Sequence, residues 1–333
     1  MGLAGFLPSI QPLLFYTLIM SDLVVSLPKN QELRDALGTI PGVRFIQWDM
    51  TGPCPEPQID IVVPPYIAGN KLLTQLNSTD ARLVQWQSIG YNGVEKYLPA
   101  GIPFANATSV HEASTAELTL ALILASQRGL PDFIAEGLAH DWRPRIQPSL
   151  ADRNILLIGY GGVAKAIEAR LGGFEVALTR LARKARDDRN LAGEVVPIHA
   201  MSSLEDCLAT CDIAIVALPL TEDTKGLINA SALAAMPTGS LLVNIGRGPI
   251  VDTDALVLEL QKGRLRAALD VTDPEPLAVD HPLWDCPGTL ITPHVGGNST
   301  AMLPRMAALI ARQIRHLQLG EAPENIVIGA WKS

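Results

Sequence analysis

The chain has 333 residues, which favours two domains or one large α/β domain. Apolar residues make up 48% and charged residues 18%, which excludes a disordered chain and predicts a sizeable buried core. The formal net charge of −8, without any long basic run, argues against nucleic acid as a partner. Four cysteines in a chain of this length do not make a disulfide framework, so we expect a cytoplasmic protein.

The first 19 residues are apolar and need a separate interpretation. A signal peptide has a basic start, but no Lys or Arg precedes Lys29. A membrane span needs about 20 unbroken apolar residues, and Pro8 and Pro12 interrupt this segment. We therefore expect residues 1–19 to be an extension or an upstream mis-start before a domain that begins near Met20. Membrane association through an uncleaved anchor is the less favoured alternative.

Strand-like and helix-like runs alternate along most of the chain. The first region has strand-like runs at 23–27, 43–48, 59–63, 82–86 and 102–105, with a helix-like stretch at 30–37. The second has them at 155–158, 175–178, 211–218, 240–245, 267–271 and 289–291. Longer helices are predicted at 112–128 and 299–318. This alternation predicts parallel sheets that are covered by helices on both faces.

A glycine-rich turn, residues 159–164, follows the strand-like run 155–158. Its Gly159, Gly161 and Ala164 give the pattern G-x-G-x-x-A between a buried strand and a helix. The first glycine permits a tight turn, the second lets the backbone approach a pyrophosphate, and the small third residue lets the helix pack on the strand. The free N–H groups of the helix N-terminus also attract phosphates. The glycine-rich turn therefore predicts a dinucleotide site, with a plain βα turn as the alternative.

The strand-like run 175–178 bears on the choice of cofactor. An NAD site usually has a carboxylate after its second strand, where it binds the ribose 2′-hydroxyl. Here Thr179, Arg180 and Arg183 follow instead. A guanidinium at that place suits a 2′-phosphate, so we predict NADP, with NAD as the alternative. Both arginines would then contact the cofactor; the other interpretation is that they are solvated surface charges.

Three strand-like runs near the C-terminus end in charged side chains. Arg247 follows the first, Asp270 and Glu275 follow the second, and His294 follows the third. The carboxyl ends of parallel strands share one edge of a sheet, so these side chains can converge. An arginine can hold a ketoacid carboxylate, a histidine can supply a proton to the carbonyl oxygen, and a carboxylate can orient that histidine. The six histidines lack paired metal-ligand spacing, so we predict no metal.

These motifs resemble the D-isomer-specific 2-hydroxyacid dehydrogenases, the family of D-3-phosphoglycerate, glyoxylate/hydroxypyruvate and formate dehydrogenases. The matching runs are 113–123, 159–164, 218–228, 241–256, 270–276 and 292–297. The resemblance implies an α/β protein with two doubly wound parallel-sheet domains. A Rossmann nucleotide-binding domain, residues 113–298, is inserted in a discontinuous flavodoxin-like substrate domain, residues 20–112 and 299–333.

The resemblance also implies residue roles and an assembly. Arg247 would bind substrate, His294 would be the acid/base and Glu275 its partner. The backbone amides around Ile89 and Gly90 would bind the substrate carboxylate, and Tyr66 would also contact substrate. The motifs and the resemblance together give the expected cofactor contacts, which are Gly159, Gly161, Gly162, Val163, Thr179, Arg180, Arg183, Leu218, Pro219, Thr224, Ile245, Gly246, Asp270, Gly296, Gly297 and Thr115. Family members are commonly homodimers through the nucleotide domain, and the apolar helix 115–125 would support that contact.

The chain departs from the family pattern at two places, one in the cofactor site and one in the expected substrate site. Many members have Arg or a bulkier residue where this chain has Gly162, which removes one phosphate contact. The loop 65–70 lacks an Arg to hold a substrate phosphate, which argues weakly against phosphoglycerate. We favour NADPH-dependent reduction of a glyoxylate- or hydroxypyruvate-type 2-ketoacid to a D-2-hydroxyacid. The alternatives are a phosphoglycerate dehydrogenase-like enzyme and a non-catalytic, nucleotide-sensing corepressor-like protein.

Overall fold

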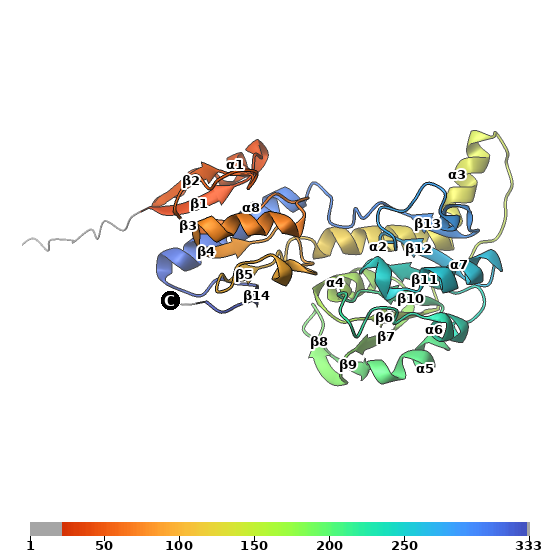
Figure 1. The fold of residues 1–333 in the computed structure, drawn as a ribbon. Helices are drawn as coiled ribbons and strands as arrows, with labels where there is room; N and C mark the ends of the chain where they lie inside the picture. Colours follow the sequence, from red (N-terminus) through yellow and green to blue (C-terminus); the bar gives the residue numbers. More distant parts are fainter. Residues whose placement is uncertain (1–21, 332–333) are drawn as a thin grey trace, which may run out of the picture.

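The structure, a computed structural model, describes residues 22–331, so the predicted extension 1–19 lies outside it. Two lobes lie side by side, and α2 (Glu112–Gln127) leads from one lobe over the other (Figure 1). The chain crosses between the lobes twice, before α2 and before α8 (Met302–Leu319). The two crossings meet where the Ser114 and Ser299 hydroxyl oxygens lie 2.6 Å apart. No helix within residues 22–331 is long and apolar enough to cross a membrane.

The first lobe is built on a six-stranded sheet with the order β14-β5-β4-β3-β1-β2. Its strands are β1 (Leu23–Leu27), β2 (Val43–Gln47), β3 (Gln58–Val62), β4 (Asp80–Gln85), β5 (Phe104–Ala105) and β14 (Ile326–Ile328). All neighbours are parallel except β14, which is antiparallel to β5. The order β2-β1-β3-β4-β5 is the flavodoxin-like doubly wound order.

The second lobe is built on an eight-stranded sheet with the order β13-β12-β11-β10-β6-β7-β9-β8. Its strands are β6 (Arg153–Ile158), β7 (Val176–Ala182), β8 (Arg186–Arg189), β9 (Val195–Ala200), β10 (Ile213–Val216), β11 (Leu241–Asn244), β12 (Arg266–Leu269) and β13 (Thr289–Ile291). Only the edge strand β8 is antiparallel to its neighbour. The parallel part has the Rossmann order, in which the strand sequence reverses beside β6. The predicted fold class is confirmed.

Helices cover both faces of each sheet. The remaining helices are α1 (Gln31–Leu37), α3 (Leu130–Leu138), α4 (Gly162–Leu171), α5 (Leu204–Leu208), α6 (Ala230–Ala235) and α7 (Thr253–Gln261). The 3₁₀ helices are η1 (Asn70–Ser78), η2 (Val94–Lys96), η3 (Met201–Ser203), η4 (Gly248–Ile250) and η5 (Pro282–Asp285). In the first lobe α1 packs on α8, and in the second α2 packs on α4. α3 stands away from the second lobe (Figure 1).

Strand β6 shows how the sequence builds this layered core. Successive strand residues face opposite sides of a sheet. Ile155 and Leu157 pack in the cluster that contains α2 and α4, whereas Leu156 and Ile158 pack in the cluster that contains α5, α6 and α7. Both faces are buried, so the strand is a continuous apolar run rather than an alternating one.

The predicted strands are all present, and one end is displaced by four residues, whereas the other ends lie within two residues of the prediction. The predicted run ends at residue 178, but β7 continues to Ala182. Arg180 therefore lies inside the strand rather than in the loop after it. Strands β8, β9 and β14 were not predicted; β8 consists of four charged residues and has the composition of a loop. The domain boundaries at 112/113 and 298/299 stay predictions, close to the starts of α2 and α8.

Candidate active site

Arg247 lies just after β11, where the strand reaches the carboxyl edge of its sheet. The side chain is partly buried, which lowers the pKa of the guanidinium, and the charge of Glu275 acts in the opposite direction. Its Nη1 donates to the Gly246 carbonyl at 2.6 Å. The guanidinium is therefore held at the sheet edge, where open α/β sheets bind their ligands.

Gly90, on the other lobe, contacts this arginine. A Cβ added at Gly90 would lie 1.6 Å from Arg247 Nη2, so the guanidinium packs directly on the glycine backbone. The loop is fixed from behind, because Trp86 Nε1 donates to the Gly90 carbonyl at 3.2 Å and Asn106 Nδ2 donates to the Ile89 carbonyl at 2.9 Å. The structure thus brings together the backbone and the arginine that were both expected to hold a substrate carboxylate.

Glu275 and His294 form a pair beside Arg247. His294 Nδ1 lies 2.5 Å from Glu275 Oε1, and the two side chains are 43% and 41% exposed. The hydrogen bond from His294 is the largest cause of a lowered pKa for the Glu275 carboxyl; burial opposes it, and the charges of His294 and Arg247 add to it. An ionised carboxylate only accepts, so Nδ1 carries the proton. Nε2 is then the ring nitrogen available to a substrate.

Asp270 holds the loop that carries His294. The aspartate is 3% exposed. Its carboxylate accepts from the Thr292 hydroxyl at 2.6 Å and from the backbone N–H groups of Val295 and Gly296, both at 2.9 Å. His294 itself has a φ of +52°, which is uncommon for a residue with a side chain. These bonds stabilise the loop in the conformation that directs His294 towards Glu275.

The glycine-rich turn has the shape that a dinucleotide needs. Gly159 has a φ of +99°, and a Cβ there would lie 2.6 Å from the Ala217 carbonyl oxygen. A Cβ at Gly161 would meet nothing within 4 Å, so this residue faces open space. Gly161 is also the N-cap of α4 and offers no side-chain acceptor to the first turn. The N–H groups at this helix start, Val163 included, therefore fit a pyrophosphate.

The other predicted cofactor residues lie along the same sheet edge. A Cβ at Gly246 would lie 2.7 Å from the Leu218 carbonyl oxygen, and the adjacent Ile245 is 8% exposed. Thr224 donates to the Pro219 carbonyl at 2.7 Å and so closes the turn after β10. The remaining close approaches join Gly162 to Glu112, Gly296 to Thr115, and Gly297 to His111 and Tyr66. The approach of Glu112 leaves little room for a side chain at position 162 unless the glutamate side chain moves.

Arg180 does not occupy the place expected from the sequence. Its Nε and Nη2 donate to the two carboxylate oxygens of Glu168, on α4, at 2.9 and 2.8 Å. The arginine and glutamate side chains are only 12% and 7% exposed. Arg180 is therefore committed to a buried ion pair, rather than being a loop cation that is free to meet a phosphate. Thr179 also lies within β7, whereas Arg183 is the first residue after it and is exposed.

Comparison with known proteins agrees with this geometry. Residues 120–296 match the family described as "D-isomer specific 2-hydroxyacid dehydrogenase, NAD binding domain". The chain is 32% identical to a glyoxylate reductase of Pyrococcus horikoshii over 267 residues, which cover 75% of this chain and 77% of the relative. It is 33% identical to a glyoxylate reductase of Aeropyrum pernix over 261 residues, which cover 74% and 76%.

Solved structures of the same family share the whole two-lobed architecture. A D-isomer specific 2-hydroxyacid dehydrogenase from Xanthobacter autotrophicus, in complex with NADPH and MES, superposes with a TM-score of 0.76 at 27% identity and covers 92% of this chain and 98% of that one. An NADPH-dependent glyoxylate/hydroxypyruvate reductase from Sinorhizobium meliloti, in complex with NADP and sulfate, gives 0.75 at 25% identity, with 92% and 98% covered.

The chain belongs to the D-isomer specific 2-hydroxyacid dehydrogenase family. It is therefore an oxidoreductase that uses a nicotinamide cofactor and reduces a 2-ketoacid. The relatives named as reductases favour the enzyme over a corepressor-like binding protein.

Several residues of this dehydrogenase site were missed by sequence reasoning. Asn92 Nδ2 donates to the Leu220 carbonyl at 2.5 Å and joins the two lobes. His111 stacks on Tyr66 with ring centroids 5.6 Å apart, and its Nε2 lies 2.6 Å from the Gln87 carbonyl oxygen. Nothing in the spacing of these residues distinguishes them from ordinary loop residues. Residues 22–331 contain no cluster of three or more His, Cys, Asp or Glu side chains suited to a metal.

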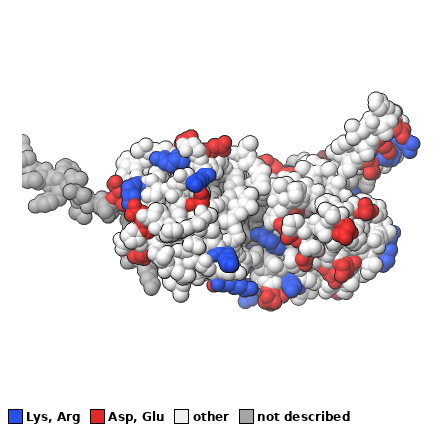
Figure 2. Space-filling model, turned by 45° about the horizontal axis from the view of Figure 1, so that its top comes forward, with Lys and Arg blue, Asp and Glu red and all other residues white. Residues whose placement is uncertain are grey.

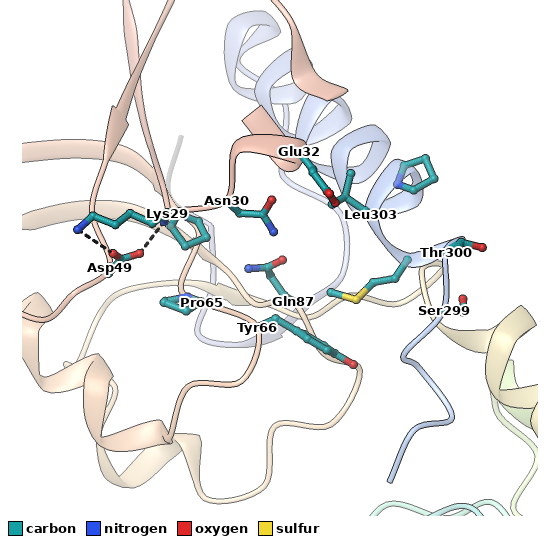
Figure 3. Close-up of a pocket in the computed structure, with 13 residues that line it drawn as sticks. Lys29, Asn30, Glu32, Asp49, Pro65, Tyr66, Gln87, Ser299, Thr300 and Leu303 are labelled. Carbon is teal, nitrogen blue, oxygen red and sulfur yellow. Dashed lines mark hydrogen bonds and ion pairs between the residues drawn. The ribbon is translucent and has the colours of Figure 1, made fainter. Parts of the chain in front are cut away.

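A cavity of about 660 Å³ opens on the first lobe of the dehydrogenase (Figure 3). It lies at the carboxyl ends of β1 to β4 and beside the start of α8. The lining residues are Pro28, Lys29, Asn30, Glu32, Asp49, Pro65, Tyr66, Gln87, Ser299, Thr300, Met302, Leu303 and Pro304. Tyr66 lines this cavity, and its hydroxyl donates to Asn298 Oδ1 at 2.8 Å. Arg247, Glu275 and His294 are not among the lining residues.

The alignment of Arg247 with Glu275 depends on Gly248. A Cβ at Gly248 would lie 1.8 Å from the Thr272 carbonyl oxygen. We expect Gly248→Ala to lower kcat/KM for ketoacid reduction by about a hundredfold, because a displacement of roughly 1 Å has that effect on a catalytic group. Steady-state kinetics and a thermal melt of the same sample measure this.

Gly173→Ala is the control for that substitution, because a Cβ at Gly173 would meet nothing within 4 Å. It should leave kcat/KM within twofold of the unmodified enzyme. Wild-type kinetics in folded Gly248→Ala would show that the two loops do not need this contact.

Proposed function

We propose that the enzyme uses NADPH to reduce a small 2-ketoacid of the glyoxylate or hydroxypyruvate type to a D-2-hydroxyacid. The observation that carries the proposal is the contact between Arg247 and the Gly90 backbone, next to the Glu275–His294 pair. Two relatives are named glyoxylate reductase, and a related structure is a glyoxylate/hydroxypyruvate reductase, which supports this substrate class.

Each side chain of the proposed active site has a separate role in the reaction. Arg247 and the backbone N–H groups at Ile89 and Gly90 bind the substrate carboxylate and orient its carbonyl group. When bound, the nicotinamide supplies the hydride to the carbonyl carbon. His294 donates the proton on Nε2 to the carbonyl oxygen, while Glu275 holds Nδ1 and stabilises the positive charge of the ring.

Arg183 supports NADPH as the reductant. The Gly159 N–H donates to the Leu181 carbonyl at 2.9 Å, so the glycine-rich turn lies beside the end of β7. Arg183 follows directly and is exposed. The nearby Glu168 carboxylate is neutralised by Arg180, so its charge does not repel a 2′-phosphate. We assign the phosphate contact to Arg183 and withdraw it from Arg180.

The catalytic assignment predicts an order of effects. His294→Ala and Arg247→Ala should lower kcat/KM by at least about a hundredfold, since a proton donor and a carboxylate anchor act in the transition state. Glu275→Gln should retain more activity. Its reductive rate should fall off at lower pH than in the unmodified enzyme, because the protonated ring loses its ionised partner.

Initial rates with glyoxylate, hydroxypyruvate, pyruvate, phenylpyruvate and 3-phosphohydroxypyruvate test this proposal over a range of pH. A preference for the phosphorylated substrate would favour the phosphoglycerate dehydrogenase-like alternative. An unchanged pH profile in Glu275→Gln would contradict the proposed pairing.

Arg183→Ala tests the cofactor choice. A charge-assisted bond to an exposed phosphate contributes about 1.5–3 kcal/mol, and salt lowers that value. We therefore expect kcat/KM for NADPH to fall roughly tenfold, with little change for NADH. Lys262→Ala, an exposed cation at the end of α7, is the control. Equal kcat/KM for the two cofactors in the unmodified enzyme would exclude the NADPH preference.

We propose further that the enzyme is a homodimer joined through α3 and the segment 139–148, here called the arm. The arm extends from the nucleotide lobe, and its tip shows few charges (Figures 1 and 2). Large apolar side chains are exposed along it: Leu130 45%, Ile134 64%, Leu138 81%, Trp142 93% and Ile146 101%. A second copy of the chain would cover this surface. The expected interface on 115–125 is less suitable, because Ala116, Leu122 and Ile123 are already buried against the same chain.

Charge on the arm should dissociate the dimer. Ile134→Asp with Leu138→Asp places two carboxylates in the proposed apolar contact, so we expect the mass measured by sedimentation to fall from that of a dimer to that of a monomer. Leu191→Asp, at a comparably exposed leucine outside the arm, should leave the mass unchanged. A monomeric unmodified enzyme would refute the proposal.

A further inference from the structure

A hydrogen-bonded network lies beneath the glycine-rich turn. Tyr160 is the residue between its first two glycines, and its hydroxyl donates to Glu168 Oε2 at 2.6 Å. Arg180 binds the same carboxylate through both oxygens. Tyr160 and Glu168 are each 6% exposed. The turn, helix α4 and strand β7 are thus joined at one buried carboxylate; we call Tyr160, Glu168 and Arg180 the Tyr160 network.

Within the network, the charges of Glu168 and Arg180 offset each other, and the Glu168 carboxylate accepts several hydrogen bonds. Asn190 Nδ2 adds a contact to Glu168 Oε1 at 3.3 Å. Burial raises the pKa of the Glu168 carboxyl, but hydrogen bonds from Arg180, Tyr160 and Asn190 and the charge of Arg180 outweigh it, so the net pKa is lowered. Burial and the bond to Glu168 raise the pKa of the Tyr160 hydroxyl. Glu168 therefore stays an acceptor and Tyr160 a donor at neutral pH.

Tyr160 connects this network to the backbone of the glycine-rich turn. The backbone on either side of it belongs to Gly159, with φ +99°, and Gly161, with φ −103° and ψ −166°. Glycine has wide conformational freedom, so the sequence alone does not hold these angles. The Tyr160 side chain is the anchor between the two flexible residues. Its hydroxyl ties the backbone between the two glycines to Glu168 on α4 and, through Arg180, to β7.

We infer that Glu168, held by Arg180, positions the dinucleotide turn by anchoring Tyr160, and so sets the affinity for NADPH and NADH alike. The inference rests on the dinucleotide site and not on the proposed choice of NADPH. If only a fraction of molecules has the competent turn, the measured dissociation constant rises in inverse proportion to that fraction. This effect applies to the pyrophosphate that both cofactors share. Arg180 is thus a positioning residue, not a phosphate ligand.

Tyr160→Phe tests the inference because it keeps the ring and removes only the hydroxyl. We would titrate the purified enzyme, without substrate, with NADPH and separately with NADH, and follow nicotinamide fluorescence. Loss of a hydrogen bond to a charged group corresponds to about tenfold or more in an equilibrium constant. We expect both dissociation constants to rise by about tenfold, their ratio to stay within twofold, and kcat at saturating cofactor to be unchanged.

Two further variants separate positioning from direct contact. Arg180→Lys keeps the charge but loses the planar fork, so it should raise both dissociation constants together. Arg183→Ala should instead change their ratio, because it acts on the 2′-phosphate alone. A thermal melt of each variant measures stability, and a purely structural role would lower the melting temperature without changing either dissociation constant.

The outcomes are distinct. A rise for NADPH alone in Arg180→Lys would show that Arg180 contacts the 2′-phosphate and would overturn the inference. Unchanged binding in Tyr160→Phe would overturn it as well, whether or not Arg180→Lys folds. An unmodified enzyme without preference for NADPH would defeat the cofactor proposal only, and an equal rise for both cofactors would still support the Tyr160 network.

Discussion

The site depends on backbone approaches that only glycine allows. A Cβ would lie 1.6 Å from Arg247 at Gly90, 1.8 Å from the Thr272 carbonyl at Gly248, and 2.7 Å from His111 at Gly297. One of these contacts joins Arg247 to the other lobe, the second joins the Arg247 loop to the Glu275 loop, and the third joins the segment after His294 to the start of α2. Each contact is possible because glycine has no Cβ: two bring a glycine backbone against the Arg247 or His111 side chain, and the one at Gly248 brings two backbones together.

Two buried carboxylates fix the loops around the site. Asp270 binds backbone groups of the His294 loop, and Glu168 binds Tyr160 of the glycine-rich turn. Both acids lie next to loops that must bind a ligand, and both are satisfied by several donors. Buried ionised groups are costly unless they are paired in this way. Each carboxylate therefore acts on ligand binding through the loop that it fixes.

Motifs with a physical mechanism made much of this molecule predictable. Strand ends that carry Arg247, Glu275 and His294 share an edge because the strands are parallel, so their convergence followed from the pattern. The predicted end of β7 was wrong, because the apolar Leu181 and Ala182 continue the strand beyond Arg180. Glu168 carried a usable signal, since a glutamate on the apolar face of a helix needs a buried cation. The partner of Arg180 and the contact of Gly90 depend on tertiary packing, which residue spacing does not encode.

The paired crossings between the lobes restrict how the enzyme moves. Two segments that touch at Ser114 and Ser299 oppose sliding of one lobe past the other. Rotation about that point remains, as in the hinge closure of other two-lobed proteins. Gly90 and Arg247 belong to different lobes and are in contact, so such a rotation would change their separation. A rotation about the paired crossings would therefore open and close the contact between Arg247 and Gly90.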